Sequence, residues 1–376
     1  VNGGAEYFAR LLAEHLTAIA DVRVLTTCAV DYHTWANEYP PGGAMLNGVE
    51  IERYPVDHER ASDGVERTAF ILQKEHTLVD EYDWMRAQGP YSTELLNAIR
   101  GAYADTDLFI FVTYLYAHTV FGLPLVADKA VLIPHAHDEP FLKLGIMRQV
   151  FHAPQAIVYN VEPEMRLVQS TMQNGYIPQF LAGVGIDAPL NVSTARFRTK
   201  FGIDGDFILY VGRIDDSKNV NELFDYFARY REQYEADLKL VLIGKAHIPI
   251  PDRPDIISPG FVSEEDKFDA LASAVALIQP SQYESLSLVA LESWLVETPV
   301  LVNGRCEVLK YQCRQSNGGL YYGNYDEFEL ALTRILSDPA MAATMGRQGR
   351  TFVQERFNWD IILAKFQALF EALTGH

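Results

Sequence analysis

Short apolar runs rich in β-branched residues alternate with amphipathic segments along the whole chain. This alternation is typical of parallel sheets joined by crossover helices, and it occurs twice. The first-half strands are expected at Val22–Thr26, Val49–Tyr54, Leu108–Val112, Ala130–Pro134, Ala156–Tyr159 and Pro178–Ala182. Those of the second half are expected at Ile208–Val211, Lys239–Ile243, Ile256–Pro259, Ala276–Gln279, Val300–Val302 and Gly319–Tyr321.

Helical periodicity fills most of the intervals between these strands, and small residues at Gly183–Val192 indicate a hinge. A glycine-rich turn at Gly3-Gly4 leads directly into the first helix. Such turns normally follow a strand, so a further strand is expected upstream of this sequence. The expected helices are Glu6–Leu16, Thr68–Arg86, Ser92–Tyr103, Val120–Ala127, Phe141–Val150, Glu162–Gln173 and Val220–Tyr230.

Composition narrows the possible functions. A chain of 376 residues exceeds one ordinary core, so two domains are expected. Three widely spaced cysteines support neither a disulfide framework nor a zinc site and suit a reducing cytoplasm. No apolar run approaches the roughly 18 residues of a membrane span. The net charge of −19 repels nucleic acid and anionic lipid, so an anionic ligand would need a local basic cluster.

One such cluster follows the strand Ile208–Val211. Arg213 ends the run Tyr-Val-Gly-Arg, and Lys218 comes just before a helix. A guanidinium, an ammonium and the amides of a helix N-terminus all bind phosphate. The pattern indicates a diphosphate site. The alternative is that both cations pair with Asp215 and Asp216.

Two carboxylates, Glu284 and Glu292, lie eight positions apart further along. Glu284 is expected in a polar loop, and Glu292 about two turns into a helix, beside its apolar stripe. A buried carboxylate needs a partner, so Glu292 either forms a salt bridge or binds a ligand hydroxyl. The amides of Ser285–Leu288, at the expected N-terminus of that helix, could bind the same anion. An anion site beside a carboxylate for hydroxyls indicates a nucleotide-sugar pocket.

Two histidines, His135 and His137, follow the strand Ala130–Pro134. The His-x-His spacing allows a metal site, but Pro134 and Pro140 favour a loop. In a loop, the histidines could instead make a polar contact to a sugar or to a leaving phosphate, or they could be structural.

Further motifs of nucleotide chemistry are absent or misplaced. Asp-x-Asp occurs at Asp105–Asp107 and Asp204–Asp206, but each run precedes a strand and is expected to form a turn. No Gly-x-Gly-x-x-Gly follows a strand, and no phosphate loop occurs. We therefore expect neither a metal nor a nicotinamide or other cofactor.

These motifs together resemble the retaining glycosyltransferases of family 4, which have the GT-B fold. The second half is similar at Tyr-Val-Gly-Arg with Lys218, at Gly-Phe-Val-Ser-Glu-Glu-Asp (260–266) and at the Glu-x7-Glu element from Glu284 to Glu292. The first half is similar at Gly3-Gly4-Ala5-Glu6 and at Ala136-His137-Asp138.

The resemblance implies an α/β protein of two Rossmann-like domains whose parallel sheets face each other across a cleft. Residues 1–186 would be the acceptor-side domain, without its first strand. Residues 187–355 would bind the nucleotide sugar. Residues 356–376 would form a helix that crosses back to the N-terminal domain.

The same resemblance implies a donor site. Arg213 and Lys218 would hold the diphosphate and neutralise it as it leaves, Glu284 would touch the transferred sugar, and Glu292 would bind the ribose. The other donor-binding positions implied are Gly3, Gly4, Phe261, Val262, Ser285, Leu286, Ser287 and Leu288.

In the N-terminal domain, the resemblance implies that His137 faces the reacting sugar, with His135 as the fallback. The chain departs from the family where Ser285, Ser287 and Glu297 replace glycines. Glu297 stands where a glycine usually ends the helix, which puts the conformation of that turn in question.

The implied activity is metal-independent transfer of a hexosyl group from a UDP- or GDP-sugar, with retention of configuration. The acceptor would be a saccharide or lipid-linked saccharide in polysaccharide or glycoconjugate synthesis. The alternatives are a nucleotide-sugar epimerase and a catalytically silent GT-B scaffold subunit. We expect no nucleic-acid partner and no transmembrane segment. The expected location is the cytoplasm, including a peripheral place at the inner face of the membrane.

Overall fold

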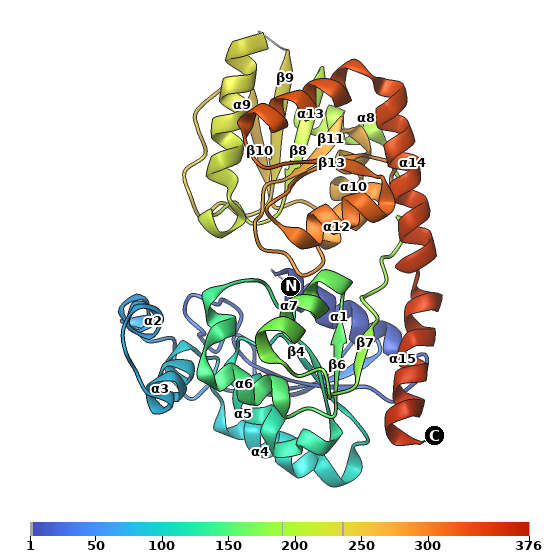
Figure 1. Cartoon of the computed structure of the whole chain (residues 1–376). Coiled ribbons are helices and arrows are strands. Elements are labelled where there is room, and N and C mark those ends of the chain that lie inside the picture. Colours follow the sequence, from blue (N-terminus) through green and yellow to red (C-terminus); the bar gives the residue numbers. More distant parts are fainter. Residues whose placement is uncertain (1–2, 190, 235–236, 376) are drawn as a thin grey trace. The chain divides into compact units, whose positions relative to one another are not determined.

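The computed structural model describes residues 3–189, 191–234 and 237–375. The chain divides into two compact units, which Figure 1 shows in colours that follow the sequence. Unit 1 comprises residues 1–185 and 362–376, and unit 2 comprises residues 186–361. The last segment of the chain therefore belongs to unit 1, although unit 2 precedes it in sequence.

Unit 2 contains one six-stranded parallel sheet with the order β10-β9-β8-β11-β12-β13. Every residue of β11 and β12 is buried, as expected where helices cover both faces of a parallel sheet. Its strands are β8 (Asp206–Val211), β9 (Leu238–Ile243), β10 (Ile256–Gly260), β11 (Ala276–Gln279), β12 (Val300–Asn303) and β13 (Gly319–Tyr322). Its helices are α8 (Thr194–Phe201), α9 (Val220–Tyr234), α10 (Glu264–Ser273), α11 (Leu288–Leu295), α12 (Glu307–Ser316), α13 (Tyr325–Ser337) and α14 (Pro339–Arg356).

Unit 1 divides its strands between two sheets. A parallel four-stranded sheet has the order β4-β5-β6-β7, and a three-stranded sheet has the order β1-β3-β2. The strands are β1 (Arg23–Thr27), β2 (Gly42–Leu46), β3 (Val49–Tyr54), β4 (Phe109–Val112), β5 (Ala130–Ile133), β6 (Ala156–Tyr159) and β7 (Gln179–Leu181). The helices are α1 (Gly4–Leu16), α2 (Gly64–Gln73), α3 (Leu78–Gln88), α4 (Thr93–Gly101), α5 (Ala117–Gly122), α6 (Gly145–His152), α7 (Glu162–Met172) and most of α15 (Trp359–Thr374).

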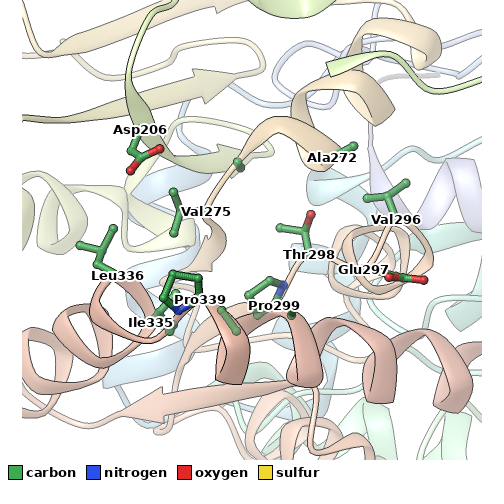
Figure 2. Close-up of a pocket in the computed structure, with 13 residues that line it drawn as sticks. Asp206, Ala272, Val275, Val296, Glu297, Thr298, Pro299, Ile335, Leu336 and Pro339 are labelled. Atoms are coloured by element: carbon green, nitrogen blue, oxygen red, sulfur yellow. The ribbon is translucent and has the colours of Figure 1, made fainter. Parts of the chain in front are cut away.

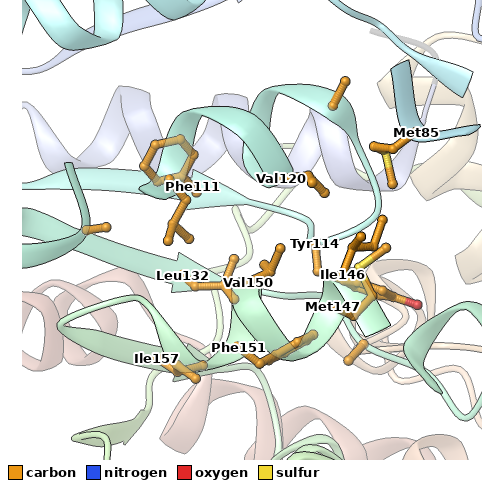
Figure 3. Close-up of a cluster of buried hydrophobic side chains, with 14 of the residues drawn as sticks. Met85, Phe111, Tyr114, Val120, Leu132, Ile146, Met147, Val150, Phe151 and Ile157 are labelled. Atoms are coloured by element: carbon orange, nitrogen blue, oxygen red, sulfur yellow. The ribbon is translucent and has the colours of Figure 1, made fainter. Parts of the chain in front are cut away.

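The core of unit 1 lies between the four-stranded sheet and its helices. In Figure 3, Leu132 of β5 and Ile157 of β6 lie on the side of Val150 and Phe151 of α6. Phe111 of β4 points to the other side, where a Cβ on Gly122 of α5 would lie 3.2 Å from its ring. All five side chains are buried. This packing fixes the carboxyl ends of β5 and β6, where the predicted histidine loop begins.

The C-terminal helix α15 is tied to unit 1 by side chains. Lys365 Nζ donates to the carbonyl of Ala182 at 3.2 Å, and Gln155 Nε2 donates to the carbonyl of Leu373 at 3.3 Å. Ile362, Phe366 and Leu369 of the helix are buried.

In unit 1, one predicted helix was wrong and one strand was missed. The single helix Thr68–Arg86 is two helices, α2 and α3, because Thr77 starts a new helix with a capping box to Asp80. The strand β2 was missed because its five residues are all exposed and carry no alternating apolar pattern. The signal that could have found it is the Asn47-Gly48 turn, whose two positive φ angles suit a hairpin.

Candidate donor site

Glycines shape the edge of the unit 2 sheet where parallel strands end. A Cβ on Gly244, after β9, would lie 1.9 Å from the carbonyl oxygen of Gly212, after β8. Gly244 also donates its N–H to Gly260, at the end of β10, at 2.9 Å. Because side chains are absent there, the three turns pack together. They place the residues that follow, Arg213 and Phe261, at one edge of the sheet.

The turn after β8 is organised by a buried carboxylate, Asp215. Its Oδ1 accepts from Ser217 Oγ at 2.7 Å and from the backbone N–H of Lys218 at 3.0 Å. Its Oδ2 lies 3.5 Å from Nε of Arg213. Arg213 therefore pairs with Asp215, as in the alternative that the sequence left open. Helix α9 begins two residues after Lys218.

Lys218 has a different partner from the one that the sequence suggested. Its Nζ lies 2.6 Å from Oε1 of Glu284, and both side chains are largely buried. The structure thus brings together two predicted site residues that are 66 positions apart, one after β8 and one after β11. A cation and a carboxylate in contact can bind a phosphate and a hydroxyl of one ligand, respectively.

The segment Ser285–Leu288 was predicted to form the N-terminus of a helix, but the predicted start of this helix was wrong. Helix α11 begins only at Leu288, so Ser285–Ser287 form a loop in front of it. Ser287 has φ 64°, a left-handed conformation that glycine adopts more readily. Of the predicted amides, only that of Leu288 belongs to the helix.

Glu292 lies just over one turn into α11, not two, and it is 3% exposed. Its Oε1 accepts from Nζ of Lys267, on α10, at 2.8 Å. Lys267 also bonds Oε2 of Glu264 at 2.7 Å. The salt-bridge alternative for Glu292 is therefore observed. Sequence reasoning missed Lys267, because nothing in its own helix signals a partner 25 residues away.

The predicted base-lining residues follow β10. Phe261 is 75% exposed and Val262 is half-buried. An exposed phenyl ring at the carboxyl edge of a sheet offers a flat apolar surface on which an aromatic base can stack.

In unit 1, the loop after β5 separates the two predicted histidines. His137 is partly exposed, and its Nδ1 lies 3.2 Å from Oε1 of Glu139, which also accepts from Tyr114 Oη at 2.7 Å. His135 is buried with its ring against Phe8, at 4.4 Å between centroids. Burial lowers the pKa of His135 to about 3, with a smaller effect of His137. Of the two, only His137 is open to a ligand.

A carboxylate that the sequence analysis did not single out binds the backbone of the loop that carries His135 and His137. Glu164 of α7 is 1% exposed and accepts N–H bonds from Ala136 and Asn160, each at 2.8 Å. Burial raises the pKa of Glu164 to about 8, although both amides oppose the rise. This carboxyl group fixes the backbone between the two histidines.

The predicted glycines at the start of α1 differ in their surroundings. A Cβ on Gly3 would meet the flexible carboxylate of Glu6 at 2.1 Å, whereas a Cβ on Gly4 would meet nothing within 4 Å. No described residue therefore requires glycine at position 4 through a steric contact.

No cluster of three or more metal-ligating side chains occurs within the described residues. Both Asp-x-Asp runs lie before strands: Asp105 ends a 3₁₀ helix, and Asp206 begins β8. Asp206 lines a cavity of about 330 Å³ together with Val275, Thr298 and Pro299, which Figure 2 shows. These residues lie at the amino ends of the strands, so this cavity is distinct from the candidate donor site.

Comparisons with known proteins bear on the family and the fold. Residues 192–352 match the family "Glycosyl transferases group 1". An uncharacterised glycosyltransferase of Methanocaldococcus jannaschii is 28% identical over 180 residues, 44% of this chain and 45% of the relative. The MMP alpha-(1->4)-mannosyltransferase of Mycolicibacterium hassiacum is 27% identical over 205 residues, 49% of this chain and 47% of the relative. The chain thus spans about half the length of the curated relatives it matches.

Solved structures resemble nearly the whole chain, and two of them serve as examples. Sucrose-phosphate synthase from Thermosynechococcus elongatus has a TM-score of 0.73 and 19% identity, over 99% of this chain and 94% of that one. The Anabaena protein HepE, in complex with UDP and glucose, has a TM-score of 0.71 and 14% identity, over 98% and 96%. At such identities the likeness concerns the fold.

The fold class is therefore confirmed as α/β of the GT-B type. The family model matches residues 192–352, within unit 2, and the relatives that match over about half of the chain are named as glycosyltransferases, in agreement with the family 4 resemblance. No helix in the described part of the chain has both the length and the apolar composition needed to cross a bilayer.

Proposed function

We propose that this glycosyltransferase moves a hexosyl group from a nucleoside diphosphate sugar to an acceptor hydroxyl and retains the anomeric configuration. The observation that carries the proposal is the contact of Lys218 with Glu284 at the carboxyl edge of the unit 2 sheet. The cation is suited to the diphosphate, and the carboxylate to a sugar hydroxyl next to it.

The mechanism follows from where charge develops. Negative charge grows on the diphosphate as the bond to the sugar breaks, and Arg213 and Lys218 would stabilise that charge more strongly than in the ground state. The loop amides of Ser285–Ser287 would donate to the same oxygens. Cations supplied by the chain itself make a metal unnecessary in this scheme. Glu292 would accept from the ribose, and His137 would contact the transferred sugar.

The finer assignments of the proposal follow the family. The donor would be a UDP- or GDP-sugar, and the acceptor a saccharide or lipid-linked saccharide in polysaccharide or glycoconjugate synthesis. HepE, which has the same fold, forms a complex with UDP and glucose, and this supports a uridine donor for this chain as well. We place the reaction in the cytoplasm.

Arg213→Ala and Lys218→Ala should each reduce turnover by about 10²-fold or more, since each removes a charge that stabilises the transition state. A thermal-shift screen of nucleoside diphosphates and their sugars first identifies the donor. Transfer is then measured with a saccharide panel, and proton NMR of the product reads the anomeric configuration.

Three results would contradict the proposal. Near-normal turnover in both variants would remove the cations from the mechanism. Epimerised sugar formed from donor alone would favour an epimerase. Absence of nucleotide binding to the wild-type protein by calorimetry would favour a catalytically silent scaffold.

A further inference from the structure

A buried lysine that no motif indicated contacts the predicted ribose-binding carboxylate. Lys267 projects from α10 onto Glu292 of α11, with Nζ 2.8 Å from Oε1. Its side chain is 12% exposed, whereas that of Glu292 is 4% exposed. The same ammonium bonds Glu264, whose side chain is 60% exposed. Lys267 thus links a buried carboxylate to one at the surface.

Because Lys267 and Glu292 are buried, each needs the opposite charge of the other to remain ionised. Burial raises the pKa of Glu292, while the attraction of Lys267 opposes the rise and Glu264 adds to it. Burial acts to lower the pKa of Lys267, but Glu292 and Glu264 outweigh it and hold this pKa above its usual value. Without the lysine, nothing in this group would oppose protonation of Glu292, and buried glutamates can have pKa values of about 8–9.

The other elements packed on α11 offer no replacement for that charge. The strands β11 and β12 present Ala276–Gln279 and Val300–Asn303, which carry no ionisable side chain. On α14, Arg350 pairs with Glu297, beyond the end of α11. From α10, the charged groups that face Glu292 are Lys267 and Glu264.

We infer that Lys267 is a positioning residue of the donor site, which keeps Glu292 ionised and oriented to accept hydrogen bonds from the ribose hydroxyls of a nucleoside diphosphate. This inference rests on the proposed function. Lys267 acts through Glu292 and does not itself bind the ligand. A protonated carboxyl group would accept a hydroxyl less well, so loss of Lys267 makes nucleotide affinity depend on pH.

Calorimetry with UDP and with GDP, from pH 7 to pH 9, tests the inference on the full chain. The nucleotide that the wild-type protein binds is then used for all variants. Lys267→Met should weaken its affinity roughly tenfold or more at pH 7. The deficit should shrink as the pH rises, because Glu292 then ionises. Lys267→Arg should restore the wild-type pH profile.

A matched control is available in Lys200 of α8, whose partner lies on the same helix as Lys267. Lys200 pairs with Asp266, also in the first turn of α10, at 2.7 Å. Lys200→Met removes an ion pair from α10 without touching Glu292, so it should leave nucleotide affinity unchanged at every pH. A loss equal to that of Lys267→Met would show that the effect comes from helix stability and would overturn the inference.

A double-mutant cycle separates positioning from direct contact. Lys267→Met should have no further effect on affinity in a Glu292→Gln background, where no carboxylate needs a partner. This comparison also holds if Lys267→Met alone fails to fold. A further loss in that background, or a single-variant deficit that is constant from pH 7 to pH 9, would overturn the inference. If wild-type protein bound neither nucleotide, the proposed function itself would fail.

Discussion

Lys218 and Glu284 form an ion pair, although the proposal gives them separate roles. Lys218 would bind the diphosphate, and Glu284 would contact the sugar. The 2.6 Å separation of the pair means that a diphosphate oxygen approaching Lys218 also approaches a carboxylate. Like charges repel most strongly where water is scarce, and Glu284 is largely buried. Affinity for the diphosphate and activation of the sugar therefore place opposite demands on this pair.

Glu284→Gln should raise affinity for UDP or GDP by roughly 3- to 10-fold, because Lys218 no longer shares its charge with a carboxylate. Transfer should fall at the same time, since the contact to the sugar is weakened. Calorimetry gives the affinity and a transfer assay gives the rate.

Asp204→Asn is the matched control for that substitution. It removes one negative charge from the amino end of the same sheet, where Asp204 pairs with Lys239 at 3.4 Å. Affinity should not change. Equal gains in both variants would mean that net charge, not the local pair, governs nucleotide binding.

At the scale of elements, the turn after α11 is formed without the glycine that the family 4 resemblance implied there. Glu297 has φ 62°, so the left-handed conformation is kept although the residue is not glycine. The close packing of α14 explains why. A Cβ on Gly346 would lie 1.8 Å from the carbonyl oxygen of Glu297, so the turn has no room to move.

Glu297→Gly should raise the free energy of unfolding by about 1 kcal/mol, because glycine adopts positive φ without the cost borne by other residues. Chemical denaturation measures the change. Glu297→Ala is the control: it removes the exposed ion pair with Arg350 but keeps the backbone conformation, so it should not stabilise the protein. A gain of equal size in both variants would assign the effect to the ion pair instead.

At the scale of the whole molecule, both units bury ionisable groups, and these groups make stability depend on pH. In unit 2, the buried carboxylate of Glu292 has a lysine partner. In unit 1, His135 is buried, and its Nε2 has no hydrogen-bond partner within the part of the chain described. Protonation of this histidine should therefore destabilise unit 1, as should that of His118, whose pKa burial lowers to about 4.

The folded-state pKa of His135, about 3, lies below the value of 6.5 expected for the unfolded chain. The unfolded state thus binds protons first, and the contribution of His135 to stability is lost as the pH falls from about 6.5 toward 3. Asparagine tolerates the positive φ of 51° at this position. His135→Asn removes this titrating group, so the free energy of unfolding should fall less between pH 7 and pH 4.5 than it does in the wild-type protein. The difference should be on the order of a few kcal/mol. Denaturant titrations across that range measure the slope, and an unchanged slope would contradict the prediction.

The sequence by itself determined most of the strands, the carboxyl-edge positions of Arg213, Lys218 and Glu284, and the motifs that carry the resemblance to a glycosyltransferase family. These features depend on local alternation, turn chemistry and short motifs, which are readable along the chain. Only the tertiary structure decided which charges meet. It paired Lys218 with Glu284 and Lys267 with Glu292, and it placed Glu164 beneath the histidine loop. Such pairings join residues from different crossover units, and their distance in space is set by sheet order and helix packing, which no local pattern specifies.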